Sequence, residues 1–150
     1  MKKKRVLAVA SAGGHWVQLL RLRDAYAHHE VGYISTNPLL APNVEGSRFI
    51  CVRDASMWDK FGLLVLSAQV FWAVLSFRPD VIISTGAAPG FFAILFGRMV
   101  GARTIWIDSI ANSEEPSKAG KLAMRVAHVW LTQWPHLAAS GAGRCLGAVI

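Results

Sequence analysis

The chain has 150 residues, of which 53% are hydrophobic and only 17% are charged. This composition supplies enough apolar side chains for one core of ordinary domain size and excludes an intrinsically disordered protein. The net charge of +7, from 16 Lys and Arg against 9 Asp and Glu, suits a partner that carries phosphate or anionic lipid. Basic and aromatic residues do not interleave along one face, so nucleic acid is disfavoured as a partner.

Short apolar segments alternate with helical patterns along the whole chain. The first, Val6–Ala10, is wholly apolar, which is typical of a strand buried on both faces of a parallel sheet. The other predicted strands are Val31–Thr36, Phe49–Val52, Val81–Ser84, Thr104–Ile107, Val129–Thr132 and Cys145–Ile150. Strands that alternate with helices predict one doubly wound, mostly parallel, Rossmann-like α/β domain over residues 1–150.

Helices are predicted between these strands. They cover residues 15–28, Phe61–Phe77, Phe91–Val100 and Lys118–His128, whereas residues 37–46 contain two Pro, two Asn and a Gly and are predicted as a loop. Residues 61–77 are the most apolar segment and lie at the lower limit of length for crossing a bilayer. Because Pro79 and a strand follow directly, a packed or membrane-surface helix is favoured over a transmembrane one.

Two groups of residues are the candidate membrane contacts. Phe71 and Trp72 lie on the apolar helix, and a basic run precedes the first strand. The basic run consists of Lys2, Lys3, Lys4 and Arg5. This start imitates a secretory signal peptide, but its apolar stretch is shorter than the roughly 7–15 residues of such a peptide. The protein is therefore expected in the cytoplasm, peripheral on the inner face of the cell membrane.

The sequence SAGGHWVQLL, residues 11–20, follows the first strand and opens a helix. Gly13 and Gly14 lack Cβ atoms, so their backbone N–H groups can approach an anion closely, and the helix N-terminus favours negative charge. His15 in the first turn is a candidate general base or phosphate ligand, and Ser11 is a candidate substrate contact. The alternative is a tight turn with an incidental His. The spacing matches neither a dinucleotide fingerprint nor a P-loop, so no cofactor is predicted.

Two further loops follow predicted strands. STGAAPG, residues 84–90, is a small-residue turn in which Thr85, Gly86 and Gly90 are candidate substrate-binding residues, although an ordinary strand–helix loop has the same composition. The third loop begins at residue 108, and its polar side chains can hydrogen-bond sugar hydroxyls. Its candidates are Asp108, Ser109 and Asn112. In a doubly wound sheet the ligand lies outside the carboxyl ends of the strands, so all three loops are expected to converge on one crevice.

The remaining chemistry-bearing residues favour structural roles. His136, in the segment LTQWPHL, follows a strand and lies beside Pro135, which is typical of a structural surface His. Cys51 and Cys145 have no metal-ligand spacing, and no metal site is predicted.

Five segments in this order resemble one known family. They are SAGGHWVQLLRL, RPDVIISTGAAPG, the IDSIAN region, KAGKLAMRVAH and LTQWPHL. The chain resembles the membrane-associated subunit of the two-subunit N-acetylglucosaminyltransferase of lipid-linked oligosaccharide synthesis, and its bacterial counterparts, the PssD-type proteins of exopolysaccharide assembly. The resemblance implies the amino-terminal, acceptor-binding half of a GT-B glycosyltransferase, a metal-independent enzyme class, here working with a separate donor-binding subunit that holds the UDP-sugar.

The resemblance also implies roles for individual residues. The residues that match the family pattern are Gly13, Gly14, His15, Gly86, Gly90, Asp108 and Ser109. It implies that His15 is the base and that the glycine loops meet the diphosphate of a polyprenyl-diphosphate-linked glycan. Asn112 departs from a basic residue that is common in the eukaryotic branch, so the exact acceptor and donor stay open.

Two other functions fit the same residues. One is a non-catalytic scaffold that recruits the donor-binding subunit to the membrane. The other is a free-standing nucleotide-sugar enzyme, such as an epimerase, which would hold a uridine site within this one chain.

Overall fold

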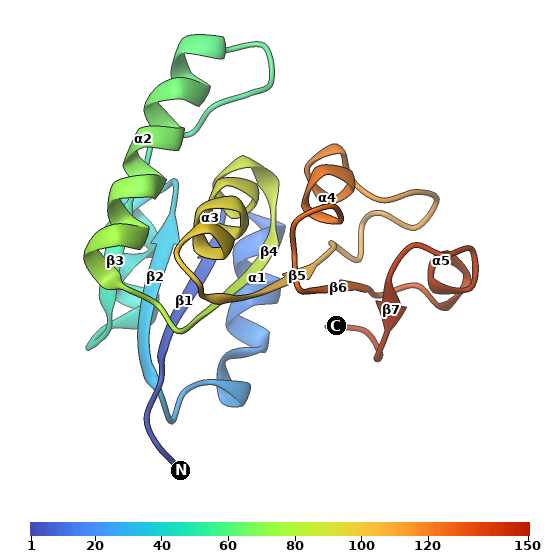
Figure 1. The fold of residues 1–150 in the computed structure, drawn as a ribbon, viewed down its shortest axis with the longest axis horizontal. Helices are drawn as coiled ribbons and strands as arrows, with labels where there is room; N and C mark the ends of the chain where they lie inside the picture. The colour runs from blue at the N-terminus through green and yellow to red at the C-terminus, as the bar shows by residue number, and fades with distance from the viewer.

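The computed structural model describes all 150 residues, and its seven strands form one sheet in the order β3-β2-β1-β4-β5-β6-β7 (Figure 1). The strands are β1 (Arg5–Ala10), β2 (Glu30–Ser35), β3 (Arg48–Cys51), β4 (Val81–Gly86), β5 (Arg103–Ile107), β6 (Val129–Thr132) and β7 (Arg144–Cys145). Every neighbouring pair is parallel. The predicted doubly wound, Rossmann-like α/β fold is confirmed.

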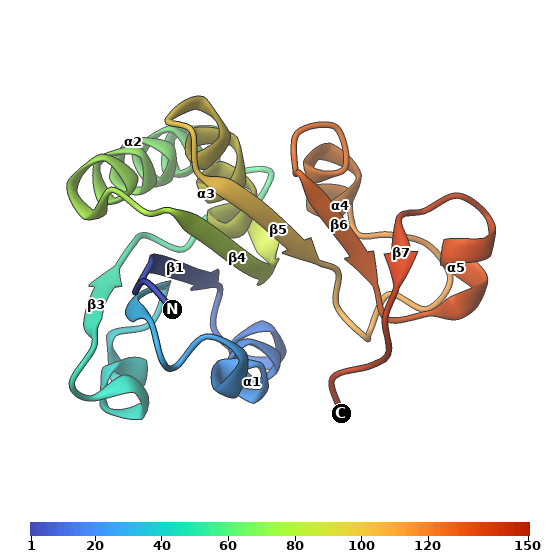
Figure 2. The same ribbon diagram turned by 60° about the horizontal axis from the view of Figure 1, so that its bottom comes forward.

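Helices cover both faces of the sheet (Figure 2). They are α1 (Gly14–Arg21), α2 (Lys60–Phe77), α3 (Ala87–Met99), α4 (Lys118–Ala123) and α5 (Pro135–Ala139), with the 3-10 helices η1 (Arg23–Ala25) and η2 (Pro38–Val44). Successive residues of β1 enter different cores: Leu7 and Val9 pack with α2 and α3, whereas Val6 and Ala8 pack with α1. A strand that is buried on both faces must be apolar at every position, which explains the unbroken apolar run of β1.

Several predicted boundaries are wrong. The helix predicted over residues 15–28 ends at Arg21, and the chain then folds back so that the hydroxyl of Tyr26 donates to the carbonyl of Leu19 at 2.9 Å. The helix predicted to end at His128 ends at Ala123 and continues as isolated turns before β6.

Two segments for which no helix was predicted contain one. Residues 37–46 include η2, because the Asn37 side chain accepts a hydrogen bond from the backbone N–H of Leu39 and Pro38 suits the first helical position. The segment after β6 forms α5, again with a proline, Pro135, in the first turn.

The last predicted strand, Cys145–Ile150, is also wrong. The strand β7 contains only Arg144 and Cys145. Beyond it, Gly147 has a φ of +119°, and the backbone N–H of Val149 donates to the Gln133 side chain at 2.6 Å instead of joining a ladder. A glycine with positive φ breaks the extended backbone that strand pairing requires.

The order of the strands reverses between β1 and β4, which lie side by side at the centre of the sheet. The chain leaves β1 for α1 on one face of the sheet and leaves β4 for α3 on the other face (Figure 2). The two connections therefore diverge at the carboxyl ends of β1 and β4. This switch point is the position of the predicted crevice, where open α/β sheets bind their ligands.

Candidate functional site

His15 joins two loops that 70 sequence positions separate. From the first turn of α1 its Nδ1 lies 2.9 Å from the carbonyl oxygen of Thr85 at the end of β4, and the Thr85 hydroxyl donates to the carbonyl of His15 at 2.6 Å. A carbonyl can only accept a hydrogen bond, so Nδ1 carries the proton. The neutral ring then has its lone pair on Nε2, where it can accept a proton from a bound hydroxyl.

The His15 ring lies so close to β4 that Gly86 must lack a side chain. A Cβ on Gly86 would lie 2.5 Å from Nδ1 of His15, and the φ of Gly86 is +137°. Ala87 also has a positive φ, +67°, which is costly for a residue with a Cβ. These two residues turn the chain directly from β4 into α3, so the turn predicted over residues 85–90 is much shorter than expected.

Gly90 lies inside the first turn of α3 and is buried. A Cβ there would collide with the hydroxyl of Ser84 and press on the Trp106 ring. The glycine thus lets α3 pack closely on the sheet, so that this helix begins directly at the end of β4. Its predicted contact with substrate stays a prediction.

The two helices at the crevice begin without a capping side chain. Neither α1 nor α3 has a side-chain hydrogen bond at its N-cap, which is glycine in both cases. By contrast, Asp59 accepts from Gly62 N at the start of α2, and Ser117 accepts from Gly120 N at the start of α4. The first N–H groups of a helix have no intrahelical partner, which applies to the first amides of α1 and to those of Ala87 and Ala88 in α3. The N–H of Gly86 already donates to the Ser84 hydroxyl at 3.2 Å, and Pro89 has no N–H.

A buried network of glutamine side chains connects α1, the helix that carries His15, to two loops. One turn along α1, the Gln18 side chain donates to the hydroxyl of Ser109 at 3.0 Å and accepts from Gln133 at 2.6 Å. Gln133 also donates to the carbonyl of Asp108 at 2.9 Å. The network ties α1 to the loops after β5 and β6, so the third predicted loop does reach the helix that carries His15.

Neither glutamine is among the residues predicted from the sequence. Gln18 lies between Trp16 and Leu19 on the buried face of α1, and Gln133 directly follows β6. A lone polar residue on an apolar helix face is the signal that could have identified Gln18, because such a group is buried only with a partner.

Asp108 uses its carboxylate inside the protein. The side chain is buried and accepts hydrogen bonds from Trp106 Nε1 at 3.1 Å, Asn112 Nδ2 at 3.1 Å, and the Ser117 backbone and hydroxyl at 3.0 and 2.7 Å. These bonds close the loop between β5 and α4 and position the cap of α4. A contact between Asp108 or Asn112 and a substrate stays a prediction.

Side chains of the segment LTQWPHL form hydrogen bonds to the backbone of the loop between β5 and α4. Trp134 Nε1 donates to the carbonyl of Ile110 at 2.8 Å, and His136 Nε2 lies 2.6 Å from the carbonyl of Ser113, to which it donates. The structural role expected for His136 agrees with this geometry.

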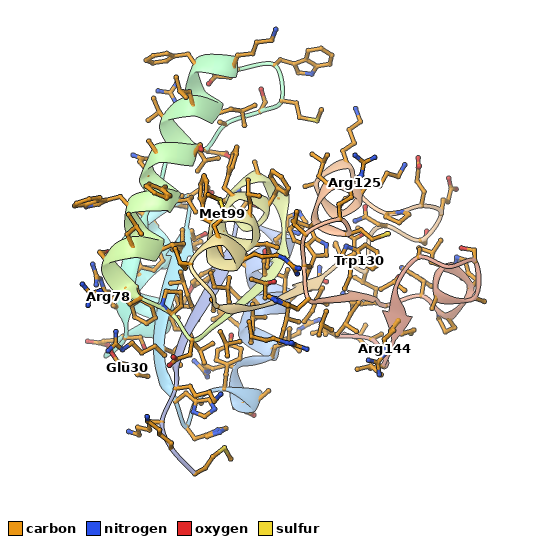
Figure 3. The ribbon with its side chains drawn as sticks, in the orientation of Figure 1. Glu30, Arg78, Met99, Arg125, Trp130 and Arg144 are labelled. Atoms are coloured by element: carbon orange, nitrogen blue, oxygen red, sulfur yellow. The ribbon has the colours of Figure 1, made fainter.

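The apolar helix α2 exposes one of its two sides. Leu66, Val70 and Val74 are buried against the sheet, whereas Phe61 and Trp72 are about 70% exposed. Side chains project along this free side of α2 (Figure 3). By length and composition alone the helix could cross a membrane, and 33% of it is buried inside the protein.

The other candidate membrane residues lie at the opposite edge of the sheet from the crevice. Lys2, Lys3 and Lys4 are exposed ahead of β1. Arg5 donates to the carbonyl of Phe77 at 3.3 Å, so the basic run adjoins the carboxyl-terminal end of α2. The remaining candidate, Phe71, lies on α2 itself and is 39% exposed, less than Trp72.

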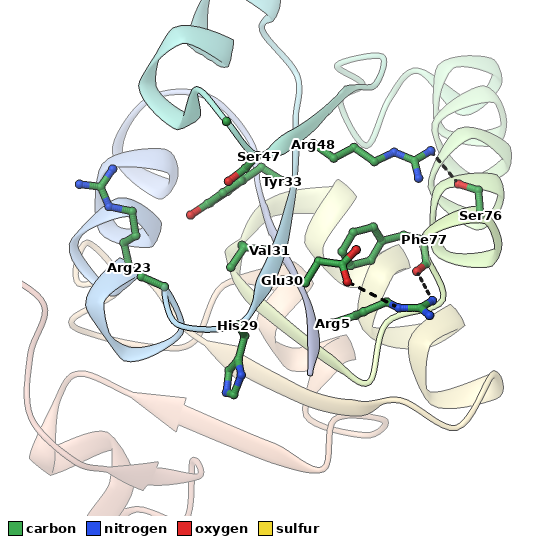
Figure 4. Close-up of a pocket in the computed structure, with 12 residues that line it drawn as sticks. Arg5, Arg23, His29, Glu30, Val31, Tyr33, Ser47, Arg48, Ser76 and Phe77 are labelled. Carbon is green, nitrogen blue, oxygen red and sulfur yellow. Dashed lines mark hydrogen bonds and ion pairs between the residues drawn. The ribbon is translucent and has the colours of Figure 1, made fainter. Parts of the chain in front are cut away.

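A cavity of about 610 Å³ also lies at that opposite edge (Figure 4). Two of its three arginines already have partners: Arg5 pairs with Glu30, and Arg48 donates to the hydroxyl of Ser76. Arg23 extends away from them. Because ligands of doubly wound sheets bind at the carboxyl ends of strands, this cavity is a weaker candidate than the switch point.

The sequence matches no known family model and no curated protein. Solved structures do share its fold. MurG from Acinetobacter baumannii aligns with a TM-score of 0.71 at 16% identity over 88% of this chain and 42% of that chain. UDP-N-acetylglucosamine 2-epimerase from Rickettsia bellii aligns with a TM-score of 0.71 at 11% identity over 93% and 42%. A glycosyltransferase from Rickettsia africae ESF-5 aligns with a TM-score of 0.65 at 14% identity over 89% and 37%.

At these identities the likeness establishes the fold alone. The chain spans about two fifths of the length of the proteins that it matches. It therefore has the Rossmann-like fold of the amino-terminal half of GT-B glycosyltransferases and of the related epimerases.

Proposed function

We propose that the chain is the acceptor-binding half of a split GT-B glycosyltransferase. It moves a sugar from a UDP-sugar onto a glycan that is carried on a polyprenyl diphosphate, and a separate donor-binding subunit holds the UDP-sugar. The observation that carries the proposal is that the two small-residue turns meet at the switch point. There Nδ1 of His15 lies 2.9 Å from the carbonyl oxygen of Thr85. The GT-B-like fold supports sugar transfer as the reaction class.

In the proposed reaction the free N–H groups at the starts of α1 and α3 hold the acceptor diphosphate. His15 Nε2 takes the proton of the acceptor hydroxyl while the hydroxyl oxygen attacks the anomeric carbon of the sugar. The bond between the sugar and UDP breaks, and UDP remains on the donor-binding subunit. The Thr85 carbonyl keeps the His15 ring in the tautomer that this step requires.

The proposed place of work is the inner surface of the cell membrane. The exposed apolar side of α2 supports this, because a contiguous apolar surface on a protein needs a covering partner. Lys2, Lys3 and Lys4 would add attraction to anionic headgroups of about 1 kcal/mol each close to the surface.

The test uses the tagged chain, purified from its own cells together with the proteins that bind it. The complex is incubated with radiolabelled UDP-sugars and a polyprenyl-diphosphate-linked sugar. We expect label in the lipid fraction, and a loss of roughly 100-fold or more in the His15→Ala complex. A His15→Ala complex that keeps its partner and transfers at the wild-type rate would instead support a scaffold.

A nucleotide-sugar enzyme is the second candidate, because the epimerase fold aligns with the same TM-score, 0.71, as MurG. Calorimetry with UDP on the isolated chain separates the two. We expect no binding, since the proposal places the uridine site on another subunit, and UDP binding at micromolar concentrations would favour the epimerase-like function.

A further inference from the structure

An apolar groove of about 450 Å³ lies beside the crevice. The loop before α2 and the first turns of α2, α3 and α4 surround it, and 9 of its 11 lining residues are hydrophobic. Met57 and Leu63 line it from the side of α2, Ala87 and Phe91 from α3, and Leu122 from α4. All of these segments lie at the carboxyl edge of the sheet (Figure 1).

The groove and the crevice meet at one turn of the chain. Ala87 lines the groove, and the residue before it, Gly86, lies against the His15 ring. A ligand whose anionic end lies at the amides of this turn would therefore have an apolar channel directly beside it. Lys118, exposed at the start of α4, adds a positive charge to the groove.

The lining of the groove indicates a hydrocarbon occupant. Its volume falls within the range of roughly 300–1,000 Å³ that is typical of small-molecule sites, but Ser56 and Lys118 are its only polar side chains. A sugar or a nucleotide base would leave its polar groups unpaired there, whereas each buried methylene gains free energy.

The apolar surface continues outward from the groove. Met57 and Leu122 at the groove are 59% and 49% exposed, and the neighbouring Trp58 and Phe61 are still more exposed. This surface leads to the free side of α2, so a chain longer than the groove would meet further apolar side chains where it leaves the groove. A closed pocket for a short apolar molecule would not need such a path.

We propose that this groove binds the first part of the hydrocarbon chain of a lipid diphosphate, the part next to the phosphates. The inference rests on the proposed function, because the diphosphate must lie at the turn between β4 and α3. It adds a second binding element, which selects a diphosphate that carries a hydrocarbon chain over a diphosphate alone. A segment of the donor-binding subunit is the competing occupant.

Calorimetry on the full chain tests the groove with three probes: farnesyl diphosphate, inorganic pyrophosphate and farnesol. We expect farnesyl diphosphate to bind at least about 10-fold more tightly than pyrophosphate, because part of its chain leaves water. Leu122→Glu should abolish this ratio, because it places a charge on the groove. Met99→Glu is the matched control: it is an exposed apolar residue at the far end of α3 and should keep the ratio.

The outcomes separate the groove from the proposed function. If pyrophosphate binds and the farnesyl chain adds nothing, the groove proposal is overturned and the diphosphate site stands. If the farnesyl compounds bind in a Leu122-dependent way while pyrophosphate does not, the groove stands and the diphosphate site fails. If no probe binds, or if Met99→Glu removes the ratio as fully as Leu122→Glu, the groove proposal is overturned. A melting curve for each variant confirms that it is folded.

Discussion

The helices at the switch point begin without a capping side chain, whereas the loop after β5 is closed by side-chain hydrogen bonds. At the switch point, Gly13 and Gly86 are the N-cap residues of α1 and α3, and neither helix has a side-chain hydrogen bond at its cap. In the loop, the carboxylate of Asp108 accepts from Trp106, Asn112 and Ser117. The comparison teaches that a carboxylate placed in a loop satisfies the donors of that loop internally, whereas a glycine at an N-cap leaves the first amides of its helix without a side-chain partner.

The largest expected effect on stability tests the loop. Asp108→Ala leaves the buried donors of Trp106 and Ser117 without a partner, and we expect a loss of about 3 kcal/mol in the free energy of unfolding. Thermal unfolding measures this as a fall in Tm of roughly 6–12 °C. The exposed carboxylate of Glu114 in the same loop is the control, and Glu114→Ala should change the free energy by less than about 0.5 kcal/mol. A wild-type Tm for Asp108→Ala would mean that the loop is not held by this carboxylate.

The next effect tests the switch point. Gly86→Ala places a methyl group against the His15 ring at a φ of +137°. We expect a loss of about 1–3 kcal/mol in stability, since the backbone conformation is strained for alanine. The rate of sugar transfer should fall even at temperatures where the Gly86→Ala variant is fully folded, because the added methyl group displaces the His15 ring.

Gly101→Ala is the matched control for Gly86→Ala. Gly101 also has a positive φ, +87°, but nothing lies near its Cβ position and it follows α3 at the other edge of the sheet. It should lose about 1 kcal/mol in stability and keep full transfer activity. Equal transfer by the two variants would argue that the His15 position does not matter.

An effect of similar size tests the link between the two regions. Gln18→Leu removes the bonds of α1 to Ser109 and Gln133, and we expect a loss of about 2 kcal/mol because buried partners remain unpaired. Urea unfolding measures it. If Gln18→Leu is as stable as the wild type, the amide network does not hold α1 to the loop.

The smallest effect concerns the hydrogen bond from Trp134 to the loop after β5. Trp134→Phe removes the 2.8 Å bond to the carbonyl of Ile110 and should cost about 1 kcal/mol. Hydrogen exchange should speed up at residues 109–115 and stay unchanged in α1. Faster exchange in both segments would show that the two regions are not separable.

The sequence was sufficient to predict the fold and to place the first two loops at the same edge of the sheet. The unbroken apolar run at Val6–Ala10 indicates a central parallel strand, and residues that follow adjacent strands must meet at the same edge of the sheet. The meeting of His15 with Thr85 follows from that rule, although the short turn through Gly86 and Ala87 does not.

Other features depend on contacts between distant parts of the chain. The pairing of Gln18 with Gln133 spans 115 positions, and no local pattern indicates which polar residue is buried with which partner. The four bonds of Asp108 are equally invisible in a sequence, because an acidic residue after a strand looks the same whether it is open or enclosed. The strand β7 ends early because Gly147 follows it, a local signal that the apolar residues around it obscured.

The central claim is that the switch point binds a diphosphate through backbone amides. The most direct measurement is a titration of the ¹⁵N-labelled chain with inorganic pyrophosphate, followed by amide chemical shifts in NMR. We expect saturable shifts at Gly13, Gly14 and Gly86 and at the first turn of α3. Saturable shifts confined to the loop around Asn112 or to the cavity at Arg48, or no saturable shift at any amide, would contradict the claim.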